Sequence, residues 1–182
     1  DVILGLVSSG LHANGYSLVR SLVAQWDLDL AAPYQARLRR TLGDAATDAL
    51  LTAAPQESMA TLGEVLLTPT KVYAKAVLAA RAAVGRSGLD IHGAAHSTGG
   101  GLPGNVPRAP PAEKAARVDP ARWTLPSVMR LFGALGGLDD EELRATFNGG
   151  LGMVLVVPPA ALPAAIGALG ENGVEAIVVG EV

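Results

Sequence analysis

The chain has 182 residues, 49% hydrophobic and 4% aromatic, so it can form one domain whose core consists mainly of Ala, Leu and Val. Its formal net charge of −3 and its scattered arginines provide no basic surface, and we therefore expect no nucleic-acid partner. The absence of cysteine excludes disulfides, iron–sulfur clusters and thiol nucleophiles, and we expect a cytoplasmic protein.

The first expected strand is the short apolar run Val2–Val7, which Gly5 interrupts. A loop of small and polar residues follows at positions 8–15. Asn14 is placed to cap a helix that starts near Gly15.

Helical structure is expected between this loop and the second strand. Residues 27–55 are rich in alanine with scattered charges, which indicates helical or irregular structure. Residues 57–67 predict a helix that stops before Pro69, because the residue preceding a proline avoids the α region. In residues 70–84 the apolar side chains recur at helical spacing, which predicts an amphipathic helix.

The second half of the chain alternates strands with short helices and glycine-bearing loops. Further strands are expected at residues 89–95, 114–118, 153–157 and 174–179. Further helices are expected at residues 126–135, 139–145 and 159–169. This order predicts a single α/β or α+β domain, spanning residues 1–182, with one mixed β-sheet covered by helices.

The most informative loop follows the second expected strand. It contains Thr98, Gly99, Gly100, Gly101, Asn105 and Arg108. Successive glycines let the backbone approach an anion, and a helix starting just afterwards would direct its N–H groups at that anion. Arg108 suits bidentate contact with a phosphate. The pattern favours a phosphate or other anion site, with a flexible turn as the alternative, and it matches neither the P-loop nor the dinucleotide fingerprint.

The first loop combines hydroxyl, imidazole and amide groups. Ser9, Gly10, His12 and Asn14 are its candidate functional residues. In the functional interpretation His12 donates or accepts a proton and Asn14 orients a ligand. A turn in which Asn14 only caps the next helix is the alternative.

The histidines do not predict a metal site. His92 and His96 are four residues apart on an expected strand, where that spacing spans two pleats and not one helical turn. Since no nearby carboxylate completes a ligand set, we expect no metal ligand here. His96 remains a candidate for catalysis because it lies next to the triple glycine.

Four segments, in this order, resemble motifs of the aminoimidazole ribonucleotide synthetases. They are the run Ser8-Ser9-Gly10-Leu11-His12-Ala13-Asn14-Gly15-Tyr16-Ser17-Leu18-Val19-Arg20; Leu67-Thr68-Pro69-Thr70 with Val72-Tyr73; His96-Ser97-Thr98-Gly99-Gly100-Gly101 with Asn105, Pro107 and Arg108; and Phe147-Asn148 with Gly150, Gly152 and Met153. The resemblance extends over nearly the whole chain and is to the second, C-terminal α/β domain of that family.

The resemblance implies an activity. This family converts formylglycinamidine ribonucleotide and ATP into aminoimidazole ribonucleotide, ADP and phosphate, with Mg²⁺. Phosphorylation of the formyl oxygen creates a leaving group, and the amidine nitrogen then closes the ring. An N-terminal domain that binds ATP and forms the homodimer precedes the C-terminal domain in the family.

The resemblance also gives the loops expected roles. Gly99, Gly100, Gly101, Asn105 and Arg108 would help hold the ribose 5′-phosphate or the transferring phosphate. His12 and Asn14 would orient the formyl-amidine part, and either His12 or His96 would move a proton during ring closure. Phe147 and Asn148 are expected to shape the loop and pack.

The chain also departs from the family pattern. It opens on Asp1 and lacks the N-terminal half, so we expect a fragment or processed form that does not catalyse the reaction alone. No apolar run reaches the roughly 18 residues of a membrane span, and we expect no membrane association. The alternatives are another synthetase of the same superfamily and a non-catalytic module that binds a phosphate ligand.

Overall fold

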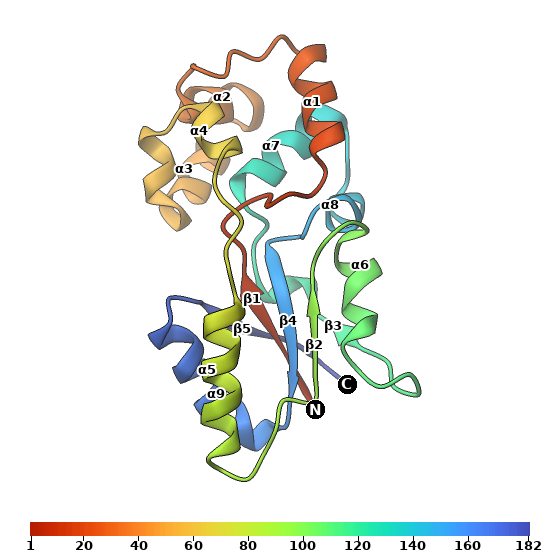
Figure 1. Cartoon of the computed structure of the whole chain (residues 1–182). Coiled ribbons are helices and arrows are strands. Elements are labelled where there is room, and N and C mark those ends of the chain that lie inside the picture. Colours follow the sequence, from red (N-terminus) through yellow and green to blue (C-terminus); the bar gives the residue numbers. More distant parts are fainter.

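The computed structural model describes residues 1–182 and contains one five-stranded sheet with helices around it (Figure 1). The strand order is β2-β4-β1-β5-β3, with β1 at Val2–Val7, β2 at Gly93–His96, β3 at Arg117–Val118, β4 at Leu151–Val157 and β5 at Ala176–Glu181. All four pairs of neighbouring strands are antiparallel. The α/β domain with one sheet and covering helices is confirmed, but the sheet is antiparallel and not mixed.

The crossovers explain why the sheet is antiparallel. β1 and β2 run in the same direction, but both pair with β4, which lies between them. In the same way, β4 and β5 run in one direction and both pair with β1. Helical connections therefore join strands that are not neighbours, as in a split β–α–β unit. The mixed sheet predicted from the order of elements is therefore wrong in the direction of its strands.

One face of the sheet packs against two helices. Leu4, Leu6 and Leu155 form a buried cluster with α5 (Ala74–Gly85) and α9 (Leu162–Glu171). The alternation of side chains along a strand directs Leu4 and Leu6 to the same face. Figure 1 shows α5 and α9 side by side next to the sheet.

The other face packs against shorter elements. Ile3 and Val156 belong to a cluster with Leu102 of α6 (Gly101–Asn105) and Val106 of the 3₁₀ turn η2 (Val106–Arg108). This packing places the triple-glycine loop beside the sheet.

The remaining helices form a third hydrophobic cluster beyond the end of β1, in the upper part of Figure 1. These helices are α1 Tyr16–Gln25, α2 Tyr34–Leu42, α3 Asp44–Ala53, α4 Leu62–Leu66, α7 Ser127–Gly136 and α8 Asp140–Thr146. The 3₁₀ turn η1 Pro55–Met59 lies against α2 and α3 without a buried residue of its own. Tyr34, Phe132 and Phe147 are the largest fully buried side chains of the cluster. Phe147 directly follows α8 and precedes β4 by four residues, so it connects this cluster to the sheet.

Several predicted boundaries are corrected. The second strand begins at Gly93 and not at residue 89, because Leu89 and Ile91 pack against the α5–α9 cluster instead. The third strand is reduced to Arg117–Val118. The helix predicted at residues 57–67 divides where a capping box at Thr61 starts α4.

Other predicted elements are confirmed with small shifts. Residues 27–55 contain α2 and α3, and the helix predicted at residues 70–84 begins at Ala74. α7 starts directly after Pro126, and a capping box at Asp139 starts the predicted acidic helix α8. Two further 3₁₀ turns are η3 Pro120–Arg122 and η4 Pro159–Ala161. None of the helices has both the length and the apolar composition needed to cross a bilayer.

Candidate ligand-binding site

The candidate loops meet at one end of three neighbouring strands. β1 and β2 end there and β4 begins there, since Val7 pairs with Leu151 and His96 with Met153. The Asn14 side chain donates from Nδ2 to the carbonyl oxygen of Ser97 at 3.1 Å, and this bond ties the first loop to the second. The structure thus brings the two loops into contact.

Asn14 is not the helix cap that one interpretation predicted. Gly15, with φ of 70°, occupies the N-cap position of α1, and no side chain caps this helix. A Cβ at Gly15 would overlap the Phe147 ring, so this position requires glycine. Asn14 instead uses its amide to hold the loop that follows β2.

Tyr73 lies between the two candidate catalytic histidines. The centroid of its ring is 6.1 Å from that of His12 and 6.2 Å from that of His96. His12 is buried, with 6% of its surface exposed, whereas His96 is exposed. The structure thus brings both histidines to one place in different environments.

The imidazole of His12 is held neutral. Its Nε2 accepts hydrogen bonds from the backbone N–H groups of Ser9, at 3.1 Å, and Lys71, at 3.5 Å. Burial, followed by the charges of His96 and Lys71, lowers the pKa of His12 from 6.5 to about 4. Because Nε2 is an acceptor, the ring proton of neutral His12 is on Nδ1, a buried atom without a hydrogen-bond partner.

The triple-glycine loop is folded around Asn105. This side chain is buried, and its Nδ2 donates to the carbonyl oxygens of Thr98 and Gly99, both at 3.2 Å, and of Gly101 at 2.7 Å. Its Oδ1 accepts from the Thr98 hydroxyl at 3.3 Å. Asn105 therefore shapes the loop. Its amide is engaged within the loop, whereas the sequence had suggested that it contacts a phosphate.

Other donors in this loop remain available. The backbone N–H groups of Gly99 and Gly100 make no hydrogen bond within the chain, and both residues are exposed. The exposed guanidinium of Arg108 donates to Asn105 Oδ1 at 3.4 Å, which places it beside the loop. These groups match the donors that a phosphate requires.

The predicted helix-end contribution to this site is small. α6 contains only five residues, and the N–H group of Gly101 donates to Thr98 O at 3.1 Å. Gly101 has φ of 57°, and a Cβ there would overlap the Arg144 carbonyl oxygen. Gly101 is thus needed for the close approach of two backbones and not for binding.

Ser9 and Gly10 hold the turn of the first loop. The Ser9 hydroxyl donates to Pro69 O at 2.7 Å, and Gly10 O accepts from the side chain of Asn148 at 2.8 Å. Asn148 is fully buried and also accepts from the N–H group of Gly150. The expected loop-shaping role of Asn148 is confirmed.

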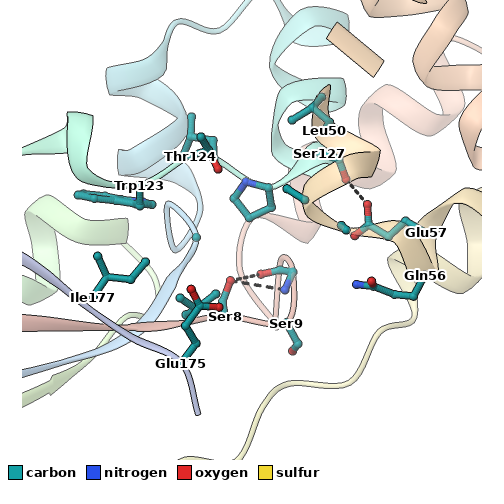
Figure 2. A pocket seen from close by; sticks show the side chains of 17 residues that line it. Ser8, Ser9, Leu50, Gln56, Glu57, Trp123, Thr124, Ser127, Glu175 and Ile177 are labelled. Carbon is teal, nitrogen blue, oxygen red and sulfur yellow. Dashed lines mark hydrogen bonds between the residues drawn. The ribbon is translucent and has the colours of Figure 1, made fainter. Parts of the chain in front are cut away.

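A cavity of about 530 Å³ opens on the other side of the first loop (Figure 2). Ser8, Ser9 and Gly10 line it together with η1 and the segment before α7. Tyr34 donates to the Ser127 hydroxyl at 2.9 Å, and Ser127 donates to Glu57, whose pKa burial raises. The lining contains carboxylates but no lysine or arginine, so this cavity does not suit a phosphate.

The chain does not offer a binding site for Mg²⁺. No group of three or more His, Asp or Glu side chains is placed to hold a metal ion. The carboxylates of Glu57 and Glu175 line the cavity without a third acidic or histidine partner. Mg²⁺ is usually bound by one or two carboxylates together with water and phosphate oxygens, and this chain provides no complete set of ligands of its own.

Sequence reasoning did not identify Tyr73 and Ser97 as site residues. Both are buried, and Tyr73 donates from its hydroxyl to Val7 O at 3.0 Å. Ser97 has a buried hydroxyl without a partner and accepts from Asn14 through its carbonyl oxygen. The only signal in the sequence was that each lies within one of the four quoted motifs.

Comparison with known proteins identifies the family. The family described as "AIR synthase related protein, C-terminal domain" matches residues 1–182. The chain belongs to this family. The resemblance of its four motifs to the aminoimidazole ribonucleotide synthetases is thereby confirmed.

Three relatives of this AIR synthase related domain share a name. Proteins named phosphoribosylformylglycinamidine cyclo-ligase from Shouchella clausii, Cyanothece sp. and Sorangium cellulosum are 41%, 38% and 38% identical to it. Each match covers 100% of this chain, but 46%, 50% and 46% of the three relatives. The chain thus spans about half the length of the curated relatives it matches.

Proposed function

We propose that this chain is the C-terminal domain of a phosphoribosylformylglycinamidine cyclo-ligase. The complete enzyme would convert formylglycinamidine ribonucleotide and ATP into aminoimidazole ribonucleotide, ADP and phosphate. The observation that carries the proposal is the pairing of two loops at one end of three neighbouring strands, through Asn14 and Ser97, in a member of this family.

The loop after β2 would hold a phosphate group. The N–H groups of Gly99 and Gly100 and the guanidinium of Arg108 are exposed donors on one loop, which Asn105 and Gly101 shape. Their ligand would be the ribose 5′-phosphate of the substrate or the phosphate that is transferred. Three donors of this kind provide both charge and direction for an anion.

The formyl-amidine part of the substrate would lie beside the first loop. Ring closure requires the amidine to lose a proton. With the pKa of His12 lowered to about 4, the exposed His96 is the better placed of the two histidines for accepting that proton. His12 would act as a neutral group that orients the substrate.

The reaction also needs groups that this chain does not contain. ATP with Mg²⁺ would supply the phosphoryl group, and their main binding residues and the homodimer contacts would lie in the part of the relatives beyond this domain. In this chain no three His, Asp or Glu side chains are placed together to hold a metal ion.

The variant Arg108→Ala in the full-length enzyme tests the phosphate assignment. Loss of a charge-assisted hydrogen bond should raise KM for formylglycinamidine ribonucleotide about tenfold or more. Arg86→Ala is the matched control, because Arg86 is exposed at the far end of α5. An unchanged KM in Arg108→Ala would show that this arginine does not bind the substrate.

A non-catalytic phosphate-binding module is the second candidate, since the three exposed donors all belong to this chain. Calorimetry with ribose 5-phosphate and a cyclisation assay on the 18.5 kDa chain separate the two functions. If the chain is only a binding module, it should bind ribose 5-phosphate but show no turnover after the N-terminal half of the enzyme is added. The cyclo-ligase predicts turnover once both halves are present.

A further inference from the structure

Tyr73 joins several parts of the candidate site. Its hydroxyl donates to the carbonyl oxygen of Val7, the last residue of β1, at 3.0 Å. Its ring lies between the imidazoles of His12 and His96, at interplanar angles of 54° and 65°. Only 5% of Tyr73 is exposed, so these contacts are made in the interior.

Besides Val7, His12 and His96, Tyr73 also contacts the backbone of β4. A Cβ at Gly152 would overlap the Tyr73 hydroxyl and lie 2.6 Å from His12 Cε1. Gly152 also accepts from the N–H group of Ser97 at 2.9 Å. Glycine at this position therefore lets β4, Tyr73 and His12 come together directly beneath the loop that follows β2.

The segment that contains Tyr73 also sets the state of His12. Lys71, two residues before Tyr73, donates its N–H group to His12 Nε2 at 3.5 Å, which is the longer of the two bonds to that atom. The backbone of His12 is in the left-handed region, with φ of 56°, a conformation that non-glycine residues keep only when their surroundings impose it. A small movement of the segment would break the Lys71 bond.

We propose that Tyr73 is a positioning residue of the candidate site: its hydroxyl anchors the 71–73 segment to β1, and the Lys71 N–H group of that segment, together with that of Ser9, then holds the His12 ring in place beside Tyr73. Burial raises the pKa of Tyr73 far above its usual range, so its hydroxyl stays protonated and can donate. Tyr73 acts through His12 and does not itself touch the substrate. The catalytic consequence rests on the proposed function, whereas the tautomer does not.

The tautomer is measured by long-range ¹H–¹⁵N correlation spectra of the histidine rings at pH 7. In the unmodified chain we expect His12 as the Nδ1–H tautomer. In Tyr73→Phe, which keeps the ring and removes only the anchoring hydroxyl, we expect the ¹⁵N resonance of His12 Nε2 to shift because the Lys71 bond is lost, while the Ser9 bond keeps the ring proton on Nδ1. Tyr16→Phe is the matched control, because the Tyr16 hydroxyl also donates to a backbone carbonyl, that of Leu66, and it should leave His12 unchanged.

The kinetic test uses the full-length enzyme. Tyr73→Phe should lower kcat about fivefold to tenfold and change KM less than about twofold, because one buried hydrogen bond that positions a reacting group is lost. An unchanged His12 Nε2 resonance or an unchanged kcat in Tyr73→Phe would overturn the proposal. If that variant does not fold, an Nε2–H tautomer in the unmodified chain would overturn it equally. Absence of any cyclisation by the unmodified enzyme would instead contradict the proposed function, and the tautomer test would stand.

Discussion

His12 shows how much a single residue depends on its surroundings. A free imidazole titrates near neutral pH, but here two backbone N–H groups occupy Nε2 and burial opposes the charged form. A protonated His12 would need to give up both bonds. The residue that looks most like a proton carrier in the sequence is therefore held buried and neutral.

The lowered pKa of His12 predicts a dependence of stability on pH. Between pH 6.5 and about 4 the unfolded chain binds a proton at His12 that the folded chain does not, so the free energy of unfolding falls as the pH is lowered through this range. The full effect of such a pKa change corresponds to roughly 3 kcal/mol. Burial of the His12 ring is the main cause of its lowered pKa, and the charges of His96 and Lys71 add to it.

Urea unfolding at pH 7 and at pH 4.5 measures this effect. His12→Asn is the matched variant, since asparagine tolerates a positive φ and does not titrate. The stability of the unmodified chain should fall more on acidification than that of the variant. Equal pH dependence in both proteins would show that His12 titrates normally in the folded state.

At the scale of elements, the loops are held by side chains of their neighbours and not by regular structure. Asn105 binds three carbonyl oxygens of the triple-glycine loop, and Asn148 joins Gly10 to Gly150. Glycine-rich segments lose much conformational entropy on folding, and these amides offset that cost. The loops can therefore present a fixed set of exposed donors.

Removal of the Asn105 amide should loosen the triple-glycine loop. The variant Asn105→Ala removes a donor from three carbonyl groups, of which only that of Thr98 also accepts from the Gly101 N–H, and we expect the free energy of unfolding to fall by about 2–4 kcal/mol. The control Asn172→Ala removes one bond, to Ala168 O at the end of α9, and should cost about 1 kcal/mol or less. Equal losses in urea unfolding of the two variants would contradict the role of Asn105.

At the scale of the whole molecule, three hydrophobic clusters share one chain without a linker between them. The helical cluster lies beyond the sheet, and the two other clusters cover the faces of the sheet (Figure 1). Trp123 belongs to a sheet cluster, and Leu125, two residues later, belongs to the helical cluster. The candidate site lies where the helical cluster and the sheet meet.

This continuity predicts one cooperative unfolding transition. The two tryptophans report on different parts, because Trp26 donates to Leu135 O in the helical part and Trp123 donates to Gly149 O beside the sheet. Trp26→Phe and Trp123→Phe each leave one reporter. For each variant, its fluorescence and its circular dichroism should change at the same urea concentration. A separate midpoint for Trp26 fluorescence would show that the helices unfold apart from the sheet.

Local patterns in the sequence were sufficient for much of the fold. The apolar run in β4, the proline before α7 and the capping box at Asp139 act through neighbouring residues, so they are visible without a structure. The same holds for the glycine content of the two loops and for the motifs that identified the family. These features require no knowledge of which strands pair.

The tertiary structure decided the direction of the sheet and the roles of the buried polar residues. Asn14 and Ser97 are 83 residues apart, and Tyr73 and Val7 are 66 apart, so their bonds join segments that only the fold brings together. In this arrangement Asn14, which was expected to cap a helix, instead donates a hydrogen bond to the loop that follows β2. Hydrogen-bond partners so distant along the chain are selected by strand order and register, and no local pattern contains that information.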